Sequence, residues 1–175
     1  MRKNLPVTNV ERHVQEGAFL VSTTDPKGII TFANDEFVRL SGYSAEEMLG
    51  QPHNLVRHPD MPPAAFQDLW DTVKDGRPWY GLVKNRCKNG DFYWVDANVT
   101  PVQEQGRITG YVSIRSQPSR AQIREAERLY AAMNAGKRPG EILRRPWTPL
   151  AGLALMPRIA TALFLPLGLL LLGLM

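Results

Sequence analysis

Several short, largely hydrophobic runs between residues 18 and 116 have the composition of β-strands. Residues 18–24 and 29–33 are two such runs. They flank the sequence DPKG, which has proline at the second and glycine at the fourth position, as a β-turn prefers. Three further runs lie at residues 79–88, 91–102 and 108–116. The pattern therefore predicts one hairpin near the N-terminus and three more strands after residue 78.

The turns between the last three predicted strands are short. Asn89 and Gly90 separate the first two of them, and Glu104–Gly106 separates the last two. Asn-Gly is a strong hairpin signal because a type I′ turn needs positive φ at both central residues. We therefore expect a type I′ hairpin at residues 89–90.

Between the two groups of strands the hydrophobic spacing becomes that of helices. A short helix is predicted from Asn34 to Gly42, and Ser44 with Glu47 fits the capping box of a second one. The clearest helix follows the prolines at 62–63 and ends at Gly76. Its apolar positions fall at i, i+3, i+4 and i+7, which makes one face; they are Phe66, Leu69, Trp70 and Val73.

A longer helix is predicted after Pro118, with Ser119 as N-cap and Gly136 as its stop. Its apolar stripe is Ala126, Leu129, Tyr130 and Met133, and its opposite face is Arg and Glu. Such a stripe must dock, either on the domain's own sheet or on a second subunit.

The C-terminal part differs from the rest in charge and hydropathy. From residue 120 to residue 158 there are eight basic and three acidic residues, and residues 159–175 carry no charge. Seventeen apolar residues are near the minimum that spans a bilayer, so a membrane helix is favoured over a buried core helix. The chain stops inside this run, which fits either a fragment or a tail anchor, and its N-terminus is no signal peptide.

These features predict five segments. They are an N-terminal cap at residues 1–17, a domain at 18–117, a linker helix at 118–136, a basic juxtamembrane linker at 137–158 and a transmembrane segment, whole or truncated, at 159–175.

Composition excludes several classes of function. The net charge of +4 lies in the C-terminal basic segment, so the domain itself is not a nucleic-acid-binding surface. Cys87 is the only cysteine, which excludes an internal disulfide and a cysteine-based zinc site. There is no glycine-rich phosphate fingerprint and no paired acid and base, so we do not expect an enzyme.

The stretch HNLVRHPDMP, residues 53–62, combines basic side chains with prolines at 52, 59, 62 and 63. Prolines restrict the backbone there and hinder a long helix. From the residues alone, Arg57 and His58 are either surface charges on a turn or the rigid wall of an anion site.

The order of elements, the segment ANDEFVRLSGYSAEEMLGQ at 33–51 and the hairpin KNGDFYWV at 88–95 resemble a PAS domain. The longer strings GQPHNLVRHPDMPPAAFQDLW at 50–70 and GRPWYGLVKNRCKNGDFYWVDANVTPV at 76–102 resemble the aerotaxis receptor family of chemotaxis transducers. The resemblance implies an α+β fold, with a five-stranded antiparallel sheet and short helices on one side. It implies non-covalently bound FAD and a sensor of redox or oxygen-dependent energy state. It also implies a homodimer, a bacterial inner membrane with the PAS domain in the cytoplasm, and a downstream chemotaxis signalling domain or kinase complex as partner.

The residues offer groups for each part of a flavin. Trp70 and Trp79 suit an aromatic slot, Asn34 and Asn85 suit the donor and acceptor edge, and Arg57 or His58 suits the phosphates or adenine, with Asp60 orienting one of them. Each has a plainer alternative: Asn34 as a helix N-cap, Asn85 facing solvent, Trp70 in the core, and Arg57 with Asp60 as a loop ion pair. With the resemblance, the expected cofactor-binding residues are Asn34, Arg57, His58, Asp60, Trp79 and Asn85.

Other roles stay open. Asn98 either lines the cleft or lies on the outer surface of the sheet, on the face of Asp96. Cys87 is expected to be an ordinary thiol, so cysteine-adduct photochemistry is not expected. The rival hypotheses are a cofactor-free PAS module for dimerisation and a haem-binding PAS sensor, for which His53 or His58 would have to reach the iron.

Overall fold

The computed structural model describes residues 4–136. The predicted basic linker at 137–158 and the predicted membrane segment at 159–175 lie outside these residues. Within residues 4–136, no helix is both long and apolar enough to cross a bilayer.

The predicted five-stranded antiparallel sheet is confirmed. Its strands lie in the order β2-β1-β5-β4-β3, so the first and last strands along the chain meet in the middle of the sheet. Every pair of neighbours is antiparallel. The strands are β1 (Leu20–Thr24), β2 (Ile30–Ala33), β3 (Trp79–Arg86), β4 (Phe92–Glu104) and β5 (Arg107–Ser116).

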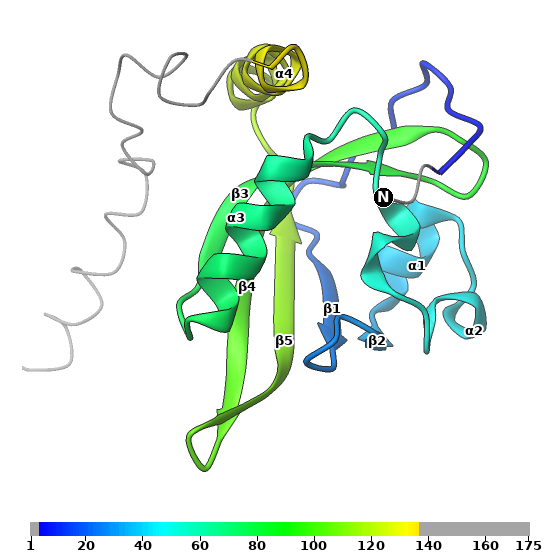
Figure 1. The fold of residues 1–175 in the computed structure, drawn as a ribbon. Coiled ribbons are helices and arrows are strands. Elements are labelled where there is room, and N and C mark those ends of the chain that lie inside the picture. The colour runs from blue at the N-terminus through cyan, green and yellow to red at the C-terminus, as the bar shows by residue number, and fades with distance from the viewer. Residues whose placement is uncertain (1–3, 137–175) are drawn as a thin grey trace, which may run out of the picture. The chain divides into compact units, whose positions relative to one another are not determined.

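Helices between β2 and β3 cover one face of this sheet (Figure 1). Helix α3 packs against β3 and β4, α1 packs against β1, and α2 packs against β2. Their bounds are α1 (Asp35–Ser41), α2 (Ala45–Met48), the 3-10 helix η1 (His53–Val56) and α3 (Pro63–Lys74). The capping box predicted at Ser44 and Glu47 is present, although the helix that it starts is only four residues long.

The hairpin predicted at residues 89–90 is confirmed by the antiparallel pairing of β3 with β4, but its turn is not of type I′. Gly90 has a φ of 103°, but Gln105 is the only non-glycine residue with positive φ in the described part of the chain, so Asn89 does not adopt the required conformation. The loop has three residues, 88–90: the Gly90 N–H donates to the Cys87 carbonyl at 3.0 Å, and the Cys87 N–H donates to the Asp91 carbonyl at 2.7 Å. The side-chain amide of Asn89 donates to the Asp91 carboxylate and accepts from the Asp91 backbone N–H. Positive φ at both central residues occurs at Gln105 and Gly106, between the paired residues Glu104 and Arg107.

Helix α4 (Arg120–Asn134) docks on the domain's own sheet, on the face opposite to α3. The apolar cluster beneath it is Leu82, Trp94, Ile123 and Ala126, with Phe92 and Tyr130 at its border. Of the predicted stripe, Ala126 is buried, while Leu129 and Met133 stay partly exposed. The stripe was predicted about one turn too far toward the C-terminus, because Ile123 carries the first docking contact.

Residues 4–17 run along the β3–β4 hairpin. Glu11 pairs with Phe92, and Asp91 receives hydrogen bonds from Thr8 and Arg12. The N-terminal segment is therefore attached to the sheet at the end where the β3–β4 loop lies.

Candidate functional site

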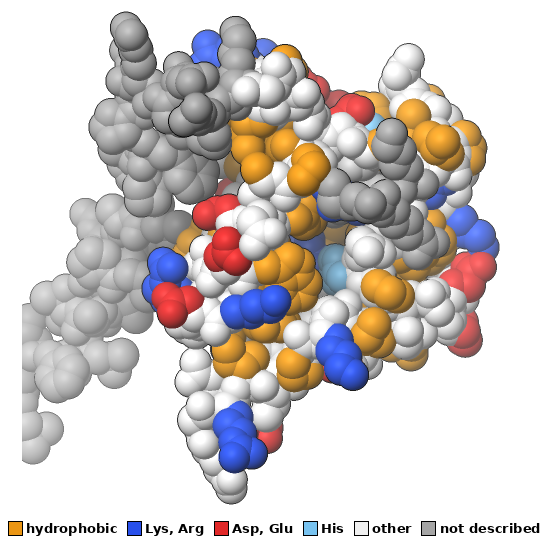
Figure 2. Space-filling view, in the orientation of Figure 1, with side chains coloured by type: hydrophobic (Ala, Val, Ile, Leu, Met, Phe, Trp, Pro, Cys, Tyr) orange, Lys and Arg blue, Asp and Glu red, His pale blue; other side chains and the backbone are white. Residues whose placement is uncertain are grey.

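A cavity of about 440 Å³ lies between α3, η1 and the inner face of the sheet. Its volume is in the range of small-molecule sites. The predicted apolar face of α3 forms one wall, and β3, β4 and β5 form the other. In the view of Figure 2, hydrophobic side chains gather beside α3 with basic and histidine side chains between them. The apolar lining residues are Phe66, Leu69, Trp70, Val73, Trp79, Val83, Ala97, Val99 and Tyr111.

The aromatic wall is held in place by specific contacts. Trp79 donates its indole N–H to the Asp68 carboxylate at 2.8 Å, which ties the start of β3 to α3. Trp70 meets Tyr111 edge-on, with 5.5 Å between ring centroids. A Cβ at Gly81 would lie 2.4 Å from the Trp79 ring, so only glycine leaves room for the ring in this position.

Arg57 and Asn85 line the cavity side by side, because a β-bridge joins their backbones. The Arg57 guanidinium donates to the Met61 carbonyl at 2.9 Å and lies 4.0 Å from the centre of the Phe66 ring. Burial lowers the pKa of this guanidinium. Asn85 is 3% exposed and lines the cavity, so the plainer alternative, that it faces solvent, is wrong.

His58 and Asp60 do not line this cavity. Arg57 has extended backbone angles, and consecutive side chains of an extended segment point to opposite sides. His58 therefore turns away from Arg57 and packs edge-on against Phe92, where burial lowers its pKa to about 4. Asp60 lies at the surface and binds the Lys84 ammonium at 2.7 Å.

Asn34 is the N-cap of α1 and lies outside the cavity lining. Its side-chain oxygen accepts from the backbone N–H groups of Phe37 and Val21, and its amide donates to the Phe19 carbonyl. These contacts are those of a helix N-cap, the plainer alternative for Asn34, because one side-chain amide both caps α1 and fixes it to β1.

Six polar lining residues were not among the predicted cofactor-binding residues, and three of them form the group described next. These three are His53, Ser113 and Arg115. Arg115 NH2 lies 2.7 Å from His53 Nε2 and donates to Ser22 Oγ at 2.8 Å. Because an arginine N–H can only donate, Nε2 of His53 is the acceptor, and Nδ1 carries the ring proton.

Burial sets the charges of this group. Burial, together with the neighbouring Arg115 charge, lowers the pKa of His53 to about 3, so this imidazole is neutral at physiological pH. Burial also lowers the pKa of Arg115, to about 10, which leaves the guanidinium charged.

The sequence contains a signal for two of these residues. Tyr111, Ser113 and Arg115 alternate along β5 and therefore share one face, and all three line the cavity. A charged residue in phase with Tyr111 on a central strand was readable as an inward-facing group. His53 carries no such signal, because its place depends on the path of the chain between α2 and α3.

Cys87 and Asn98 lie away from the cavity. The Cys87 thiol is buried, is 3.3 Å from the Leu40 carbonyl, and has a pKa raised by burial to about 11. This agrees with the expected ordinary thiol. Asn98 faces the same side as Asp96, whose carboxylate contacts Gln122 of α4, so Asn98 belongs to the outer face of the sheet.

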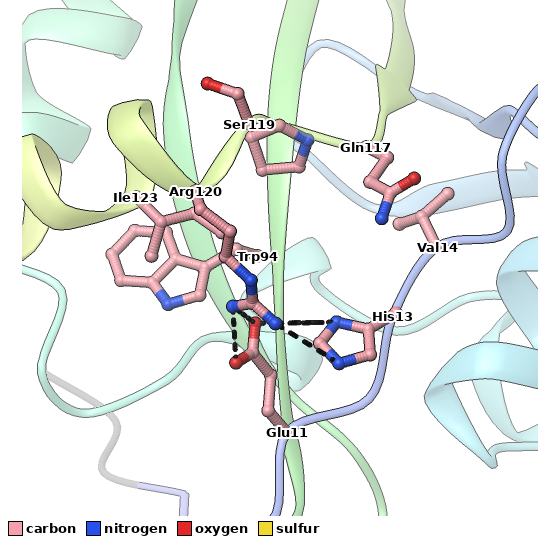
Figure 3. Close-up of a pocket in the computed structure, with 9 residues that line it drawn as sticks. Glu11, His13, Val14, Trp94, Gln117, Ser119, Arg120 and Ile123 are labelled. Carbon is pink, nitrogen blue, oxygen red and sulfur yellow. Dashed lines mark hydrogen bonds and ion pairs between the residues drawn. The ribbon is translucent and has the colours of Figure 1, made fainter.

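A second hollow, of about 360 Å³, lies where the N-terminal segment meets the start of α4 (Figure 3). Arg120 of α4 reaches both carboxylate oxygens of Glu11, at 2.8 and 2.7 Å, and also contacts the His13 ring. Trp94 and Ile123 form its apolar side. The hollow thus contains an ion pair that joins two segments flanking the domain.

Known proteins give this geometry a context. Residues 30–115 match the family described as the PAS fold. The aerotaxis receptor of Escherichia coli (strain K12) is 50% identical over 146 residues, which are 81% of this chain and 29% of the receptor. The nitrogen fixation regulatory protein of Klebsiella pneumoniae is 33% identical over 103 residues, which are 58% of this chain and 21% of that protein.

Solved structures agree with the fold. The light-state structure of the blue-light photoreceptor Aureochrome1 LOV matches with a TM-score of 0.55, covering 66% of this chain and 91% of that chain at 22% identity. A sequence identity of 22% supports a shared fold and nothing more. The two sequence relatives are a receptor and a regulatory protein, not enzymes, and residues 30–115 of this chain belong to the PAS family.

Proposed function

We propose that this chain is the sensory part of a membrane-anchored transducer, and that its cavity binds FAD non-covalently to report redox or oxygen-dependent energy state. The observation that carries the proposal is the cavity itself, with one aromatic wall and buried polar groups on the facing strands. The 50% identity to the aerotaxis receptor supports the same role.

The residues present fit the cofactor. A flavin needs an apolar slot for its ring, polar groups at its edge and positive charge for its phosphates. Trp70 and Trp79 offer the slot, Asn85 and Ser113 offer edge contacts, and Arg57 offers the charge. FAD would supply reversible electron acceptance, which no side chain of this cavity provides.

The six predicted residues then divide into two groups. Arg57, Trp79 and Asn85 contact the cofactor. Asn34, His58 and Asp60 support the wall from behind: Asn34 fixes α1 to β1, and His58 accepts a hydrogen bond from the backbone N–H of Asp60, which shapes the turn after Arg57.

The signal passes through β3 to α4. Asn85 and Val83 face the cavity, while the Leu82 carbonyl of the same strand accepts a 2.6 Å hydrogen bond from Tyr130 of α4. A ligand shifts a conformational equilibrium only by its difference in affinity for the two states. The two states of the cofactor must therefore contact β3 differently, and α4 responds because it rests on that strand.

The wider role follows from the relative and not from the described residues. The proposal places the chain in a bacterial inner membrane through residues 159–175, with the PAS domain in the cytoplasm, as a homodimer that signals to a chemotaxis domain or kinase complex. Since the chain spans 29% of the aerotaxis receptor, these functions belong to a longer protein.

Haem is a poorer fit to this cavity. His58 lies outside the lining, and Nε2 of His53 already accepts a hydrogen bond from Arg115. An iron ligand would have to displace that contact.

The experiment is an absorbance spectrum of the full chain, purified in detergent, before and after anaerobic reduction. The expected result is a yellow, non-covalent chromophore that bleaches reversibly. Arg57→Ala should lose the colour, whereas Arg77→Ala, a surface arginine paired with Asp75, should retain it. A colourless protein that does not take up added FAD would refute the proposal in favour of a cofactor-free module, and a Soret band would refute it in favour of haem.

A further inference from the structure

Arg115 is a buried cation whose partners carry no compensating charge. Its side chain is in the cavity wall and is 3% exposed. It donates to the Ser22 hydroxyl and the neutral His53 imidazole, and its guanidinium lies 4.7 Å from the centre of the Phe37 ring. The NH1 nitrogen is buried and has no hydrogen-bond partner within residues 4–136. No carboxylate of these residues forms an ion pair with it.

A second buried arginine in the same domain, Arg86, has hydrogen-bond partners for all of its guanidinium nitrogens. Arg86 is 4% exposed, and each of its three guanidinium nitrogens donates a hydrogen bond. The acceptors are the Pro6 carbonyl, the Tyr43 hydroxyl and the Lys88 carbonyl. Arg86 does not line the cavity. Incomplete pairing is therefore a property of Arg115 and not of every buried arginine in the described residues.

Ser113 is the second unpaired polar group on this wall. Its hydroxyl is buried without a hydrogen-bond partner in the described residues, and it lies two positions before Arg115 on the same face of β5. Buried polar groups are normally paired, and a buried charge without a partner is costly. Two such groups next to each other on one wall of a cavity indicate that the ligand completes them.

We propose that the β5 wall of the cavity selects for ligands that carry negative charge, with Arg115 as the selecting residue and His53 and Ser22 holding its guanidinium in place. This inference rests on the proposed function. For FAD it means that the reduced cofactor, whose ring carries more negative charge than the oxidised ring, binds more tightly than it would without Arg115. A unit charge in a weakly polar interior acts over the width of such a cavity, so direct contact with NH1 is not required.

The first test compares the dissociation constants of oxidised FAD and of FAD kept reduced under anaerobic, mildly alkaline conditions. Quenching of tryptophan fluorescence reports binding, since Trp70 and Trp79 line the cavity. The ratio of the oxidised to the reduced constant should fall at least about tenfold in Arg115→Met, equivalent to about 1.4 kcal/mol. The ratio should be unchanged in Arg86→Met. An unchanged ratio in Arg115→Met would overturn the inference while leaving FAD binding intact.

The second test works without any ligand. Urea unfolding of the ligand-free chain should show Arg115→Met to be at least as stable as the wild type, because an apolar side chain replaces an uncompensated charge. Arg86→Met should be clearly less stable, because it breaks three satisfied hydrogen bonds. If neither form of FAD binds the wild type, the proposed function fails, and this measurement alone decides the inference. Equal losses of stability in the two variants would overturn it.

Discussion

The two faces of the sheet both bury aromatic side chains, but one face packs against a helix and the other borders a cavity. On the outer face, Trp94 stacks on Tyr130 and the apolar cluster with Ile123 closes against α4. On the inner face, Trp79 and Tyr111 border a cavity of about 440 Å³ whose wall includes unpaired polar groups. The outer face is thus closed by α4 over an apolar cluster, whereas the inner face encloses a cavity with polar groups in its wall.

Alternate side chains of the strand β4 point to the two opposite faces of the sheet. Along β4, Tyr93, Val95 and Ala97 point inward, while Trp94 and Asp96 point outward. A substitution one position away therefore acts on a different function. The difference predicts that outer-face variants lower stability and spare ligand binding, while inner-face variants lower binding.

The largest expected effect is on the outer face, at Ile123. Ile123→Ala removes a buried side chain between α4 and the sheet, and we expect it to lower the free energy of unfolding by about 2–4 kcal/mol in urea. FAD affinity should stay within twofold. Leu129→Ala is the matched control, because Leu129 lies on the same helix but is only partly buried, and its loss should be much smaller. Equal losses would mean that α4 docks in another register.

The second prediction concerns acid stability and the inner face. His53 stays neutral in the folded protein down to about pH 3, whereas in the unfolded chain it takes up a proton below about pH 6.5. The unfolded state therefore binds more protons in this window, and stability falls as the pH is lowered. His58, with a pKa near 4, adds to the same slope.

His53→Gln keeps an acceptor for Arg115 but removes the titration. We expect it to reduce the loss of unfolding free energy between pH 6.5 and pH 4.5 by about 1.4 kcal/mol per pH unit. Urea titrations at several pH values measure this slope. A slope identical to the wild type would show that His53 does not stay neutral in the folded protein over this pH range.

The sequence predicted those features of the two faces that depend on residues close together along the chain. Strands and helices followed from local alternation, caps and turn residues, and the amphipathic face of α3 was assigned correctly because its spacing is local. The direction of Asn98 could not be decided from one strand. The turn type at Asn89 was wrong because the hairpin has a three-residue loop closed by backbone hydrogen bonds of Cys87, and a dipeptide preference does not fix the loop length.

The site was only partly predictable for the same reason. Arg57 and His58 were grouped by their closeness in sequence, yet an extended backbone sends them to opposite sides. The contact between His53 and Arg115 joins residues 62 positions apart, so no local pattern encodes it. Ser113 and Arg115 share the phase of Tyr111 along β5, so their direction was readable from the sequence, whereas that of His53 was not.

The third prediction tests the aromatic wall. A methyl group at position 81 would collide with the Trp79 ring, so Gly81→Ala must displace the ring and should weaken FAD binding about tenfold or more. The cause can be separated with a second substitution. In a Trp79→Leu background the collision is absent, so adding Gly81→Ala should change affinity little. A full additional loss in that background would mean that Gly81 acts through the backbone and not through Trp79.

The smallest expected effect returns to the outer face, where a single hydrogen bond joins α4 to β3. Tyr130→Phe removes its donation to the Leu82 carbonyl but keeps the ring that stacks on Trp94, and should lower the free energy of unfolding by about 1 kcal/mol. Tyr80→Phe, on the exposed part of β3, is the control and should change the free energy of unfolding by less.

The same hydrogen bond can be tested as the route of the signal. If α4 receives the state of the cavity through the bond from Tyr130 to the Leu82 carbonyl, the amide exchange rates of α4 will differ between oxidised and reduced FAD in the wild type but not in Tyr130→Phe. Persistence of that difference in the variant would assign the coupling to the Ile123 cluster instead.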